Sequence, residues 1–553
     1  MSSTMNLMWF RQDLRTFDNT AFAACCEHAR QNHAGVIALV YLTPKQWQSH
    51  RKSLWQIDLI LRQIRALEQS LSQLNIGTII RVVDDFALQA TDVLELCQQL
   101  SISHLFANLE YPVNEVARDQ YIAQQAQSLG IVTQWFDDSQ VVAPQRIVTD
   151  KGMPYKVFTP FYKRWLAMVE TAGLTLSPTP AAMAINTTQL AKDSRNANTN
   201  TNTNTNTNTN TNTNTNTNTN TNTNTNTNTN TNTNTNTNTN DYITIDAFYR
   251  AYLTPTAALD KQLNHVGKLA QLLYPAGEVA AQSRLDDFLK KHIADYNTAR
   301  DVPALNNHLG ATSRLSPYLA IGMLSPRLCY LKARQKLNSQ QGLGSEKDIM
   351  RWISELAWRD FYYDVMVNRP DIVKGKAFLT PLDESVAWRY DLADFESWYQ
   401  GKTGVPLVDA AMRCLNSTGF MHNRLRMVVA MYLSKNLLID WRWGEAYFMQ
   451  HLVDGDFASN NGGWQWSASV GTDAQPYFRV MNPFSQAATH DPDASYIQHW
   501  LPELATVPAN IINDEQKLQT YLTQNPHVAY PKLDTPTKVS RAMAIEAFKN
   551  PIP

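Results

Sequence analysis

The sequence predicts an α/β domain followed by an all-helical domain. A chain of 553 residues exceeds one ordinary hydrophobic core. Its early part alternates β-rich runs with helical patterns, and its later part is helical almost throughout. We therefore place the α/β domain at 1–140, an interdomain linker at 141–241 and the helical domain at 242–553.

The first domain contains short β-rich runs that helical patterns separate. The β-rich runs are 7–10, 36–42, 78–83, 104–108 and 132–136, and the helical patterns are 53–74, 86–100 and 113–129. This alternation favours a doubly wound parallel sheet. No G-x-G-x-x-G motif follows the first run, so a dinucleotide on a glycine-rich turn is not supported.

The linker contains an unbroken Thr-Asn repeat at 199–240, downstream of a helix expected near 162–171. The repeat has no apolar side chain whose burial could offset the entropy lost on ordering. We therefore interpret it as a disordered tether. Asparagine-rich alternation can also stack as β-structure between chains, and that alternative stays open.

The helical domain is predicted from patterns at 245–252, 280–296, 348–368, 407–415, 425–436 and 443–452, with a short tail after Pro531. Within it, the stretch 454–466 (DGDFASNNGGWQW) is predicted by local propensity to be mostly loop. Its carboxylates, glycines and indoles suit a wall for a planar cofactor with polar edges. A turn followed by a half-buried aromatic segment is the alternative.

Composition limits the function classes. Lys and Arg number 48 against 49 Asp and Glu, a net charge of -1, so any nucleic-acid binding needs a local basic face. The 5 cysteines form no C-x-x-C pair and no zinc spacing, which predicts reduced thiols and no metal site. No signal segment or membrane span is predicted, so we expect a cytoplasmic protein. Nothing in the sequence determines the oligomeric state, and a monomer is our working expectation.

Several motifs fall in order along the chain and carry a resemblance. They are WFRQDLR at 9–15, TSRLS at 312–316, ELAWR at 355–359, MHNRLRM at 421–427, DWR at 440–442 and the stretch 454–466. Together they span nearly the whole chain and resemble the photolyase/cryptochrome family, closest to class I photolyases of cyclobutane pyrimidine dimers. The resemblance implies light-driven repair of dimer-containing DNA, by electron transfer from reduced flavin adenine dinucleotide (FAD) to a dimer flipped out of the duplex.

The resemblance also implies which residues contact FAD. An ion pair between Arg426 and Asp454 is expected beside the flavin, and Asn460 is expected to face flavin N5. The implied FAD contacts are Tyr296, Thr312, Ser313, Arg314, Leu315, Ser316, Arg359, Arg426, Asp454, Gly455, Asp456 and Asn460. Taken alone, the run 312–316 is better explained as a helix N-cap than as a cofactor site.

The implied substrate residues lie on neighbouring motifs. Glu355 is expected to hydrogen-bond the thymine edge, while two indoles and a thioether pack on the dimer. The packing residues are Trp358, Trp466 and Met427, and the expected rim and phosphate contacts are Asn423, Arg424 and Arg479. On the residues alone, Trp358 belongs to a core stripe with Trp352 and Phe361, and a lone arginine is solvated surface.

Two further groups follow from the resemblance. Trp388, Trp441 and Trp464 match an electron-hopping chain from the surface to the flavin, and with Glu355 and Asn460 they form the implied catalytic set. Asn114, Glu115 and Lys374 match the site of an antenna pigment, 5,10-methenyltetrahydrofolate. A carboxylate and an amide can pair with a pterin edge, although Asn and Glu are equally welcome at a helix start.

Three other functions compete with dimer repair. A 6-4 photolyase usually carries a histidine pair in its pocket, whereas 421–423 offers one histidine. A signalling cryptochrome often has a long carboxy-terminal extension, which is not expected after the helical domain here. An FAD oxidoreductase unrelated to light would need a pyridine-nucleotide site, and no motif for one is visible.

Overall fold

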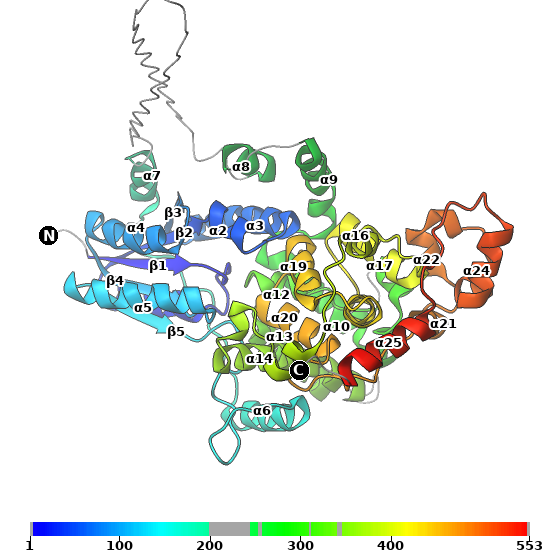
Figure 1. The fold of residues 1–553 in the computed structure, drawn as a ribbon. Coiled ribbons are helices and arrows are strands. Elements are labelled where there is room, and N and C mark those ends of the chain that lie inside the picture. Colours follow the sequence, from blue (N-terminus) through cyan, green and yellow to red (C-terminus); the bar gives the residue numbers. More distant parts are fainter. Residues whose placement is uncertain (1–3, 198–243, 253–256, 309–310, 340–345, 550–553) are drawn as a thin grey trace, which may run out of the picture.

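A computed structural model describes residues 4–197, 244–252, 257–308, 311–339 and 346–549 (Figure 1). The predicted parallel sheet is confirmed. Its strands are β1 (Met5–Phe10), β2 (Gly35–Leu42), β3 (Gly77–Val82), β4 (Ile102–Asn108) and β5 (Val132–Phe136), in the order β3-β2-β1-β4-β5. Every neighbouring pair is parallel, and the buried strand β1 lies at the centre.

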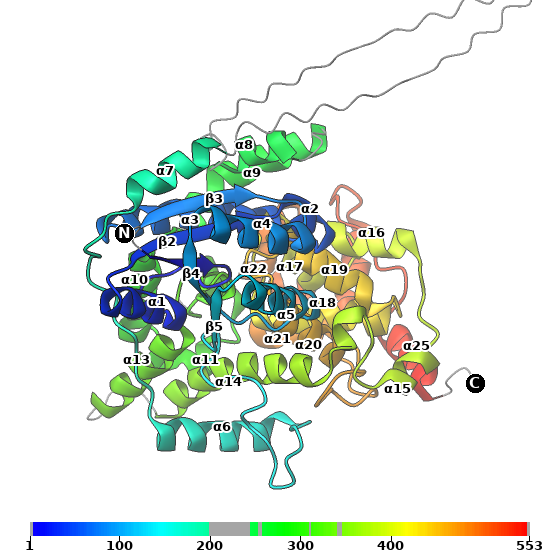
Figure 2. The ribbon, with the colours of Figure 1, turned by 90° about the vertical axis from the view of Figure 1, so that its left-hand side faces the viewer.

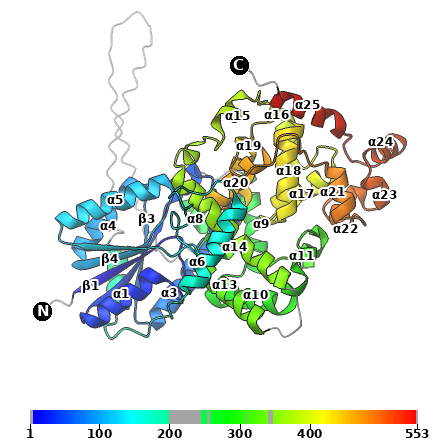
Figure 3. The ribbon, with the colours of Figure 1, turned by 90° about the horizontal axis from the view of Figure 1, so that it is seen from below.

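Helices cover both faces of the sheet, as a doubly wound fold requires (Figure 3). Alternate strand residues point to opposite faces, so Met8 packs with α1 (Thr20–Gln31) and α3 (Leu54–Gln73). Leu7 packs on the other face with α4 (Phe86–Gln99) and α5 (Val113–Ser128). A short helix, α2 (Pro44–Ser49), follows β2.

The linker contributes a helix to each domain. The expected helix is present as α6 (Phe158–Ala172), and it packs against α14 (Glu346–Asn368) of the helical domain (Figure 2). A second helix, α7 (Thr188–Ala197), was not predicted, and it lies along the edge strand β3. Its sequence is mostly polar, and the contact is set by Thr187, which accepts a hydrogen bond from Gly77 N at 2.8 Å. The Thr-Asn repeat lies outside the described residues.

The second domain is helical, as predicted. Besides α14, its α-helices are α8 (Ile245–Tyr252), α9 (Ala257–Leu273), α10 (Glu278–Lys291), α11 (Tyr296–Ala299), α12 (Ser316–Ala320), α13 (Pro326–Ser339), α15 (Thr380–Ser385), α16 (Leu392–Gln400), α17 (Pro406–Thr418), α18 (Asn423–Met431), α19 (Trp441–His451), α20 (Phe457–Ser467), α21 (Pro483–His490), α22 (Ser495–Trp500), α23 (Ala509–Ile512), α24 (Glu515–Gln524) and α25 (Thr537–Lys549). Short 3-10 helices lie at Ile293–Asp295, Pro303–His308, Ile372–Lys374 and Pro502–Leu504.

Three expectations for this domain are wrong. The stretch 454–466 is not mostly loop, because Asp456 caps a helix by accepting Ser459 N at 2.9 Å, and α20 follows. The segment after Pro531 is not a tail, because α25 packs on the turn Tyr432–Asn436. The helix expected over 425–436 leaves α-geometry after Met431 and continues as that π-helical turn.

The amino-terminal end of α3 joins the two domains next to the acidic stretch. Ser53 Oγ donates to the carbonyl of Leu452 at 2.6 Å, and Gln56 Nε2 donates to the carbonyl of Gly455 at 2.8 Å. Both side chains are buried. The sheet domain therefore fixes the backbone of the loop that carries Asp454 and Asp456.

Candidate active site

The acidic loop, residues 454–456, gathers side chains from three segments. Asp454 is buried and accepts two hydrogen bonds from Arg426 Nη2, at 3.0 and 2.8 Å. It also accepts Ser316 Oγ at 2.6 Å, while Arg426 Nε donates to the carbonyl of Met421 at 2.8 Å. The expected Arg426–Asp454 pair is thus confirmed, and it orients α18 against the loop rather than adding much stability.

Asp456, the second acid of this loop, is fully engaged by the protein. One carboxylate oxygen caps α20, and the other accepts Tyr363 Oη at 2.5 Å. Burial and the neighbouring Asp456 carboxylate raise the pKa of Tyr363 well above its usual range, so the phenol stays a neutral donor. Arg359 lies over the ring of Tyr363 and donates to the carbonyl of Ser139, at the end of the sheet domain, at 2.5 Å.

One face of α20 has room for a flat group. Asn460, Gly463 and Trp466 recur at helical spacing and so share that face. A Cβ on Gly462 would meet the Tyr362 ring at 2.1 Å, whereas a Cβ on Gly463 would meet nothing within 4 Å. Glycine inside a helix costs about 1 kcal/mol relative to alanine. Bare backbone at Gly463 therefore suits a planar ligand at close range. The amide of Asn460, one turn earlier, donates through Nδ2 to the carbonyl of Glu445 on α19 at 2.9 Å.

The run 312–316 leads into α12, which is only five residues long. Arg314 has a left-handed backbone, φ 51°, and Arg284 Nε donates to the carbonyl of Ser313 at 2.9 Å. Ser316 is exposed although Leu315 before it is buried. The run thus presents hydroxyls beside the acidic loop. The dipole of a helix as short as α12 contributes little to binding a phosphate.

Glu355 is held by an arginine that the sequence analysis missed. Arg300 Nη1 lies 2.5 Å from Glu355 Oε1, and the guanidinium lies 5.3 Å from the ring centroid of Tyr296. Arg351, one turn before Glu355 on α14, is 3.6 Å from the same oxygen. Arg300 follows the predicted Tyr296 by one helical turn, and this spacing could have revealed it.

Trp358 has a stacking partner in the linker. The rings of Phe158 and Trp358 are nearly parallel, with an interplanar angle of 8° and centroids 3.6 Å apart. Phe158 N donates to Asp473 Oδ2 at 3.0 Å, which fixes the start of α6 against the segment after α20. Trp352 and Phe361 are buried, whereas Trp358 is only half-buried. Its ring still contacts Phe361, with centroids 5.8 Å apart, so it forms the exposed end of the core stripe.

The predicted rim residues lie on α18 and on the segment that follows α20. Asn423 and Arg479 are exposed, and Met427 and Trp466 are half-buried. Arg424 Nη2 pairs with Asp301 Oδ2 at 2.7 Å, so it is less free than a surface arginine. His422 caps α18, and burial lowers its pKa to about 4, which keeps the ring neutral.

The three predicted electron-transfer tryptophans are linked by neighbouring elements. Trp388 Nε1 and Trp441 Nε1 both donate to Asp383 Oδ1, at 3.2 and 3.0 Å, and Asp383 pairs with Arg442. A Cβ on Gly444, one turn after Trp441, would meet the Trp464 ring at 2.1 Å. The glycine therefore lets Trp464 of α20 lie directly against α19. Asp383 belongs to none of the motifs in the sequence, so it was not predicted as a site residue.

The predicted antenna residues lie where the two domains meet. Asn114 is exposed and Glu115 is buried in the first turn of α5, and Lys374 is exposed at the end of a 3-10 helix. Val373, beside Lys374, packs in one cluster with Tyr111 of the sheet domain. Both proposed roles of the Asn114–Glu115 pair, ligand contact and helix start, fit this placement.

A group of three charged residues of the sheet domain, Lys52, Glu110 and Glu115, borders the domain interface, and we call it the interdomain acidic cluster. Burial raises the pKa of Glu115 to about 7, and repulsion from Glu110 adds to the shift. Burial lowers the pKa of Lys52, and attraction to Glu110, Glu115 and Asp456 only partly offsets it. The charge of Lys52 therefore interacts both with Asp456 of the acidic loop and with Glu115 of the expected antenna site.

Comparison with known proteins now adds to this geometry. Residues 6–183 match the family model for DNA photolyase, and residues 352–550 match that for the FAD binding domain of DNA photolyase. The deoxyribodipyrimidine photo-lyase of Escherichia coli is 37% identical over 93% of this chain and 92% of its own. That of Vibrio cholerae is 37% identical over 99% of both chains.

The chain belongs to the DNA photolyase family. A crystal structure of a class III photolyase from Agrobacterium tumefaciens superposes with a TM-score of 0.74, at 26% identity over 99% of this chain and 98% of its own. The FAD-binding domain of this photolyase is the helical part that contains the acidic loop, α18 and α20.

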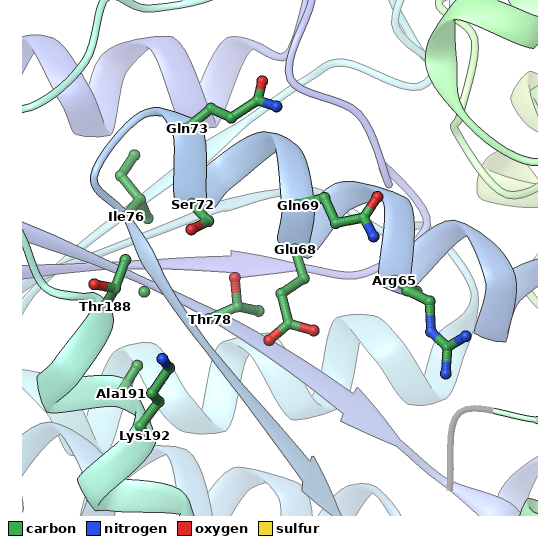
Figure 4. A pocket seen from close by; sticks show the side chains of 11 residues that line it. Arg65, Glu68, Gln69, Ser72, Gln73, Ile76, Thr78, Thr188, Ala191 and Lys192 are labelled. Atoms are coloured by element: carbon green, nitrogen blue, oxygen red, sulfur yellow. The ribbon is translucent and has the colours of Figure 1, made fainter. Parts of the chain in front are cut away.

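A separate cavity in this photolyase lies away from these residues. It has a volume of about 720 Å³ and lies between α3, β3 and α7 at the outer edge of the sheet (Figure 4). Arg65 and Glu68 line one side and Lys192 the other. None of the lining residues belongs to the predicted sites, and charges of both signs are mixed there. We do not assign the photolyase active site to it.

Membrane-spanning helices and metal-binding clusters are both absent from the residues that the structure describes. Its helices there are too short or too polar to cross a membrane. Among the same residues, no three His, Cys, Asp or Glu side chains are grouped so as to hold a metal ion.

Proposed function

We propose that this protein repairs cyclobutane pyrimidine dimers in DNA, in a light-driven reaction of the deoxyribodipyrimidine photo-lyase type. The observation that carries the proposal is the convergence on Asp454. Asp454 accepts hydrogen bonds from Ser316 and Arg426, and Asp456, two residues later, caps α20. Around it lie the residues that suit a flavin on one side and a flipped base on the other.

The donor set around the acidic loop fits FAD. Hydroxyls of the 312–316 run and the guanidinium of Arg426 suit its phosphates and ribose, and the amide of Asn460 suits the edge of its ring. The open face at Gly463 leaves room for a planar system. When bound, reduced and excited by light, FAD supplies the electron that splits the dimer.

The neighbouring side chains suit a dimer that has left the duplex. Trp358 and Trp466 offer stacking surfaces, each worth about 1–3 kcal/mol per base. Unstacking is least costly for damaged bases, which favours the dimer over intact DNA. Glu355 can hydrogen-bond the pyrimidine edge while Arg300 holds its carboxylate in place. Arg424 and Arg479 are placed to contact phosphates, as sequence-independent anchors.

Three finer assignments belong to the same proposal. Asn114, Glu115 and Lys374 bind an antenna pigment, 5,10-methenyltetrahydrofolate. Trp388, Trp441 and Trp464 relay electrons to the flavin. The protein works as a cytoplasmic monomer on DNA, and the five free, buried thiols fit a reducing compartment.

A repair assay tests the proposal. Protein with reduced flavin is mixed with a duplex oligonucleotide containing one thymine dimer, in blue light and in darkness. We expect repair only in the light. Absence of repair, with flavin bound and reduced, would contradict dimer repair, and a duplex with a 6-4 lesion is the matched alternative substrate.

Glu355→Ala sharpens this assay. Loss of the carboxylate removes a hydrogen bond that strengthens as charge develops on the base, so we expect the repair yield to fall about tenfold or more. Flavin retention should change little, since Glu355 pairs with Arg300 and Arg351 rather than with the acidic loop. Loss of flavin from this variant would show that Glu355 belongs to the cofactor site instead.

A further inference from the structure

Lys435 is a fully buried lysine whose polar contact within the described ranges is a backbone carbonyl. It lies in the π-helical turn Tyr432–Asn436, and its ammonium donates to the backbone carbonyl of Arg479 at 3.2 Å. No carboxylate in the described ranges pairs with it. Burial lowers its pKa to about 8, so it remains mostly charged at neutral pH.

Such a residue is a poor choice for stability alone. A buried ammonium loses its hydration, and an apolar side chain of similar length would fill the same space at lower cost. The surrounding turn is also irregular, and π-helical turns are frequent at functional sites. Lys435 is therefore better explained by what its hydrogen bond holds than by packing.

Its hydrogen bond connects two parts of the site rim. The turn continues α18, which carries Arg424 and Met427. The carbonyl it holds belongs to the segment after α20, where Gln475 N donates to the carbonyl of Trp466 at 3.4 Å. Lys435 thus fixes the distance between the helix and the segment that flank the dimer site.

The held segment presents side chains to solvent. Arg479 N donates to the carbonyl of Pro476 at 2.9 Å, which closes a tight turn. The Arg479 side chain is exposed, and Phe478 before it is 55% exposed. The carbonyl of Arg479 is thus held from inside by Lys435, while its side chain lies in solvent.

We propose that Lys435 is a positioning residue for DNA, which holds the backbone of Arg479 so that the guanidinium reaches a phosphate beside the lesion. This inference rests on the proposed function, because it takes Arg479 as a phosphate contact. A preorganised arginine loses less conformational entropy on binding than a free one. Lys435 would therefore affect how strongly DNA binds without touching DNA itself.

The test is a double-mutant cycle on DNA binding. Lys435→Met, Arg479→Ala and the double variant are each titrated with a dimer-containing duplex in darkness, at several salt concentrations. We expect each single variant to bind about fivefold more weakly, with the slope of log affinity against log salt reduced by about one phosphate contact. The double variant should bind no more weakly than Arg479→Ala, because both changes remove the same contact.

Ser434→Ala is the matched control. Ser434 is buried in the same turn and donates to the carbonyl of Ala430 at 2.7 Å, so its loss perturbs the turn but not the Arg479 segment. Its salt slope should equal that of the unchanged protein. Flavin content and thermal unfolding of all variants separate a folding defect from a positioning defect.

Each remaining outcome has a distinct meaning. If Arg479→Ala binds normally, the phosphate assignment in the proposed function is wrong. If Arg479→Ala binds weakly while Lys435→Met binds normally, or if the two effects add, the positioning role of Lys435 is overturned.

Discussion

Asp454 in the acidic loop and Glu115 in the interdomain acidic cluster are buried carboxylates that the protein holds in opposite ways. In the loop, Asp454 is paired with Arg426 and Asp456 caps a helix. In the cluster, Glu115 lies near Glu110, and burial raises its pKa to about 7. A fully partnered acid is a fixed part of a site, whereas a poorly compensated one responds to pH and to what binds beside it.

Removing Asp454 should give the largest effect. Asp454→Asn leaves Arg426 without its ion-pair partner, a loss that costs about 3–5 kcal/mol when both partners are fully buried. The Arg426 side chain is 26% exposed, so we expect a loss of about 2 kcal/mol in the free energy of unfolding, together with a loss of bound flavin. Flavin bound per protein after gel filtration measures the loss of flavin.

Asp440→Asn is the control for this variant. Asp440 also caps a helix, α19, and pairs with Arg442 at 3.0 Å, but it lies outside the loop. Its flavin content should stay near that of the unchanged protein. Equal losses in both variants would mean that the effect is general destabilisation.

Binding of the antenna pigment should depend on the protonation of Glu115. If the ionised form of Glu115 pairs with the pterin, antenna affinity increases as pH rises through about 7 and is constant above it. Between pH 8 and pH 6 the affinity should fall about tenfold. Absorbance titrations with methenyltetrahydrofolate measure this, with flavin content, expected to be constant, followed alongside.

Glu115→Gln should abolish this pH dependence, because the amide does not titrate. A pH profile that persists in the variant would assign it to another group. A flat profile in the unchanged protein would show that Glu115 does not bind the pigment as a carboxylate.

Changing Lys52 should have the smallest effect. Lys52→Met removes a cation that attracts Glu115, so the midpoint of the antenna pH profile should move upward by less than about one unit. The direction of this shift is the test, because removing a nearby cation raises the pKa of a carboxylate. A midpoint that stays unchanged or falls would show that Lys52 does not stabilise the ionised form of Glu115.

Sequence reasoning succeeded where one local pattern or one ordered motif decides the structure. The alternating strands predicted the parallel sheet, and the paired motifs predicted the Arg426–Asp454 contact. The helix α20 was missed because Gly462 and Gly463 lower local propensity, while packing of Gly462 on Tyr362 decides its conformation. Tertiary contact overrode propensity there.

The missed site residues share one property. Phe158, Arg300, Asp383 and Lys435 each act through a partner more than 40 residues away in the chain, so no short pattern marks them. Arg300 alone follows a predicted residue at helical spacing. Predicting the others requires the fold first, because only the fold brings their partners within hydrogen-bonding or stacking distance.

The two hydrogen bonds from the start of α3 affect how this protein can be divided. Ser53 and Gln56 belong to the sheet domain, yet they hold the carbonyls of Leu452 and Gly455 beside the acidic loop. A helical domain cut free of the sheet would lose these donors and leave the loop unsupported. In a chimaera that exchanges the sheet domain, α3 should therefore be kept with the helical domain that it supports.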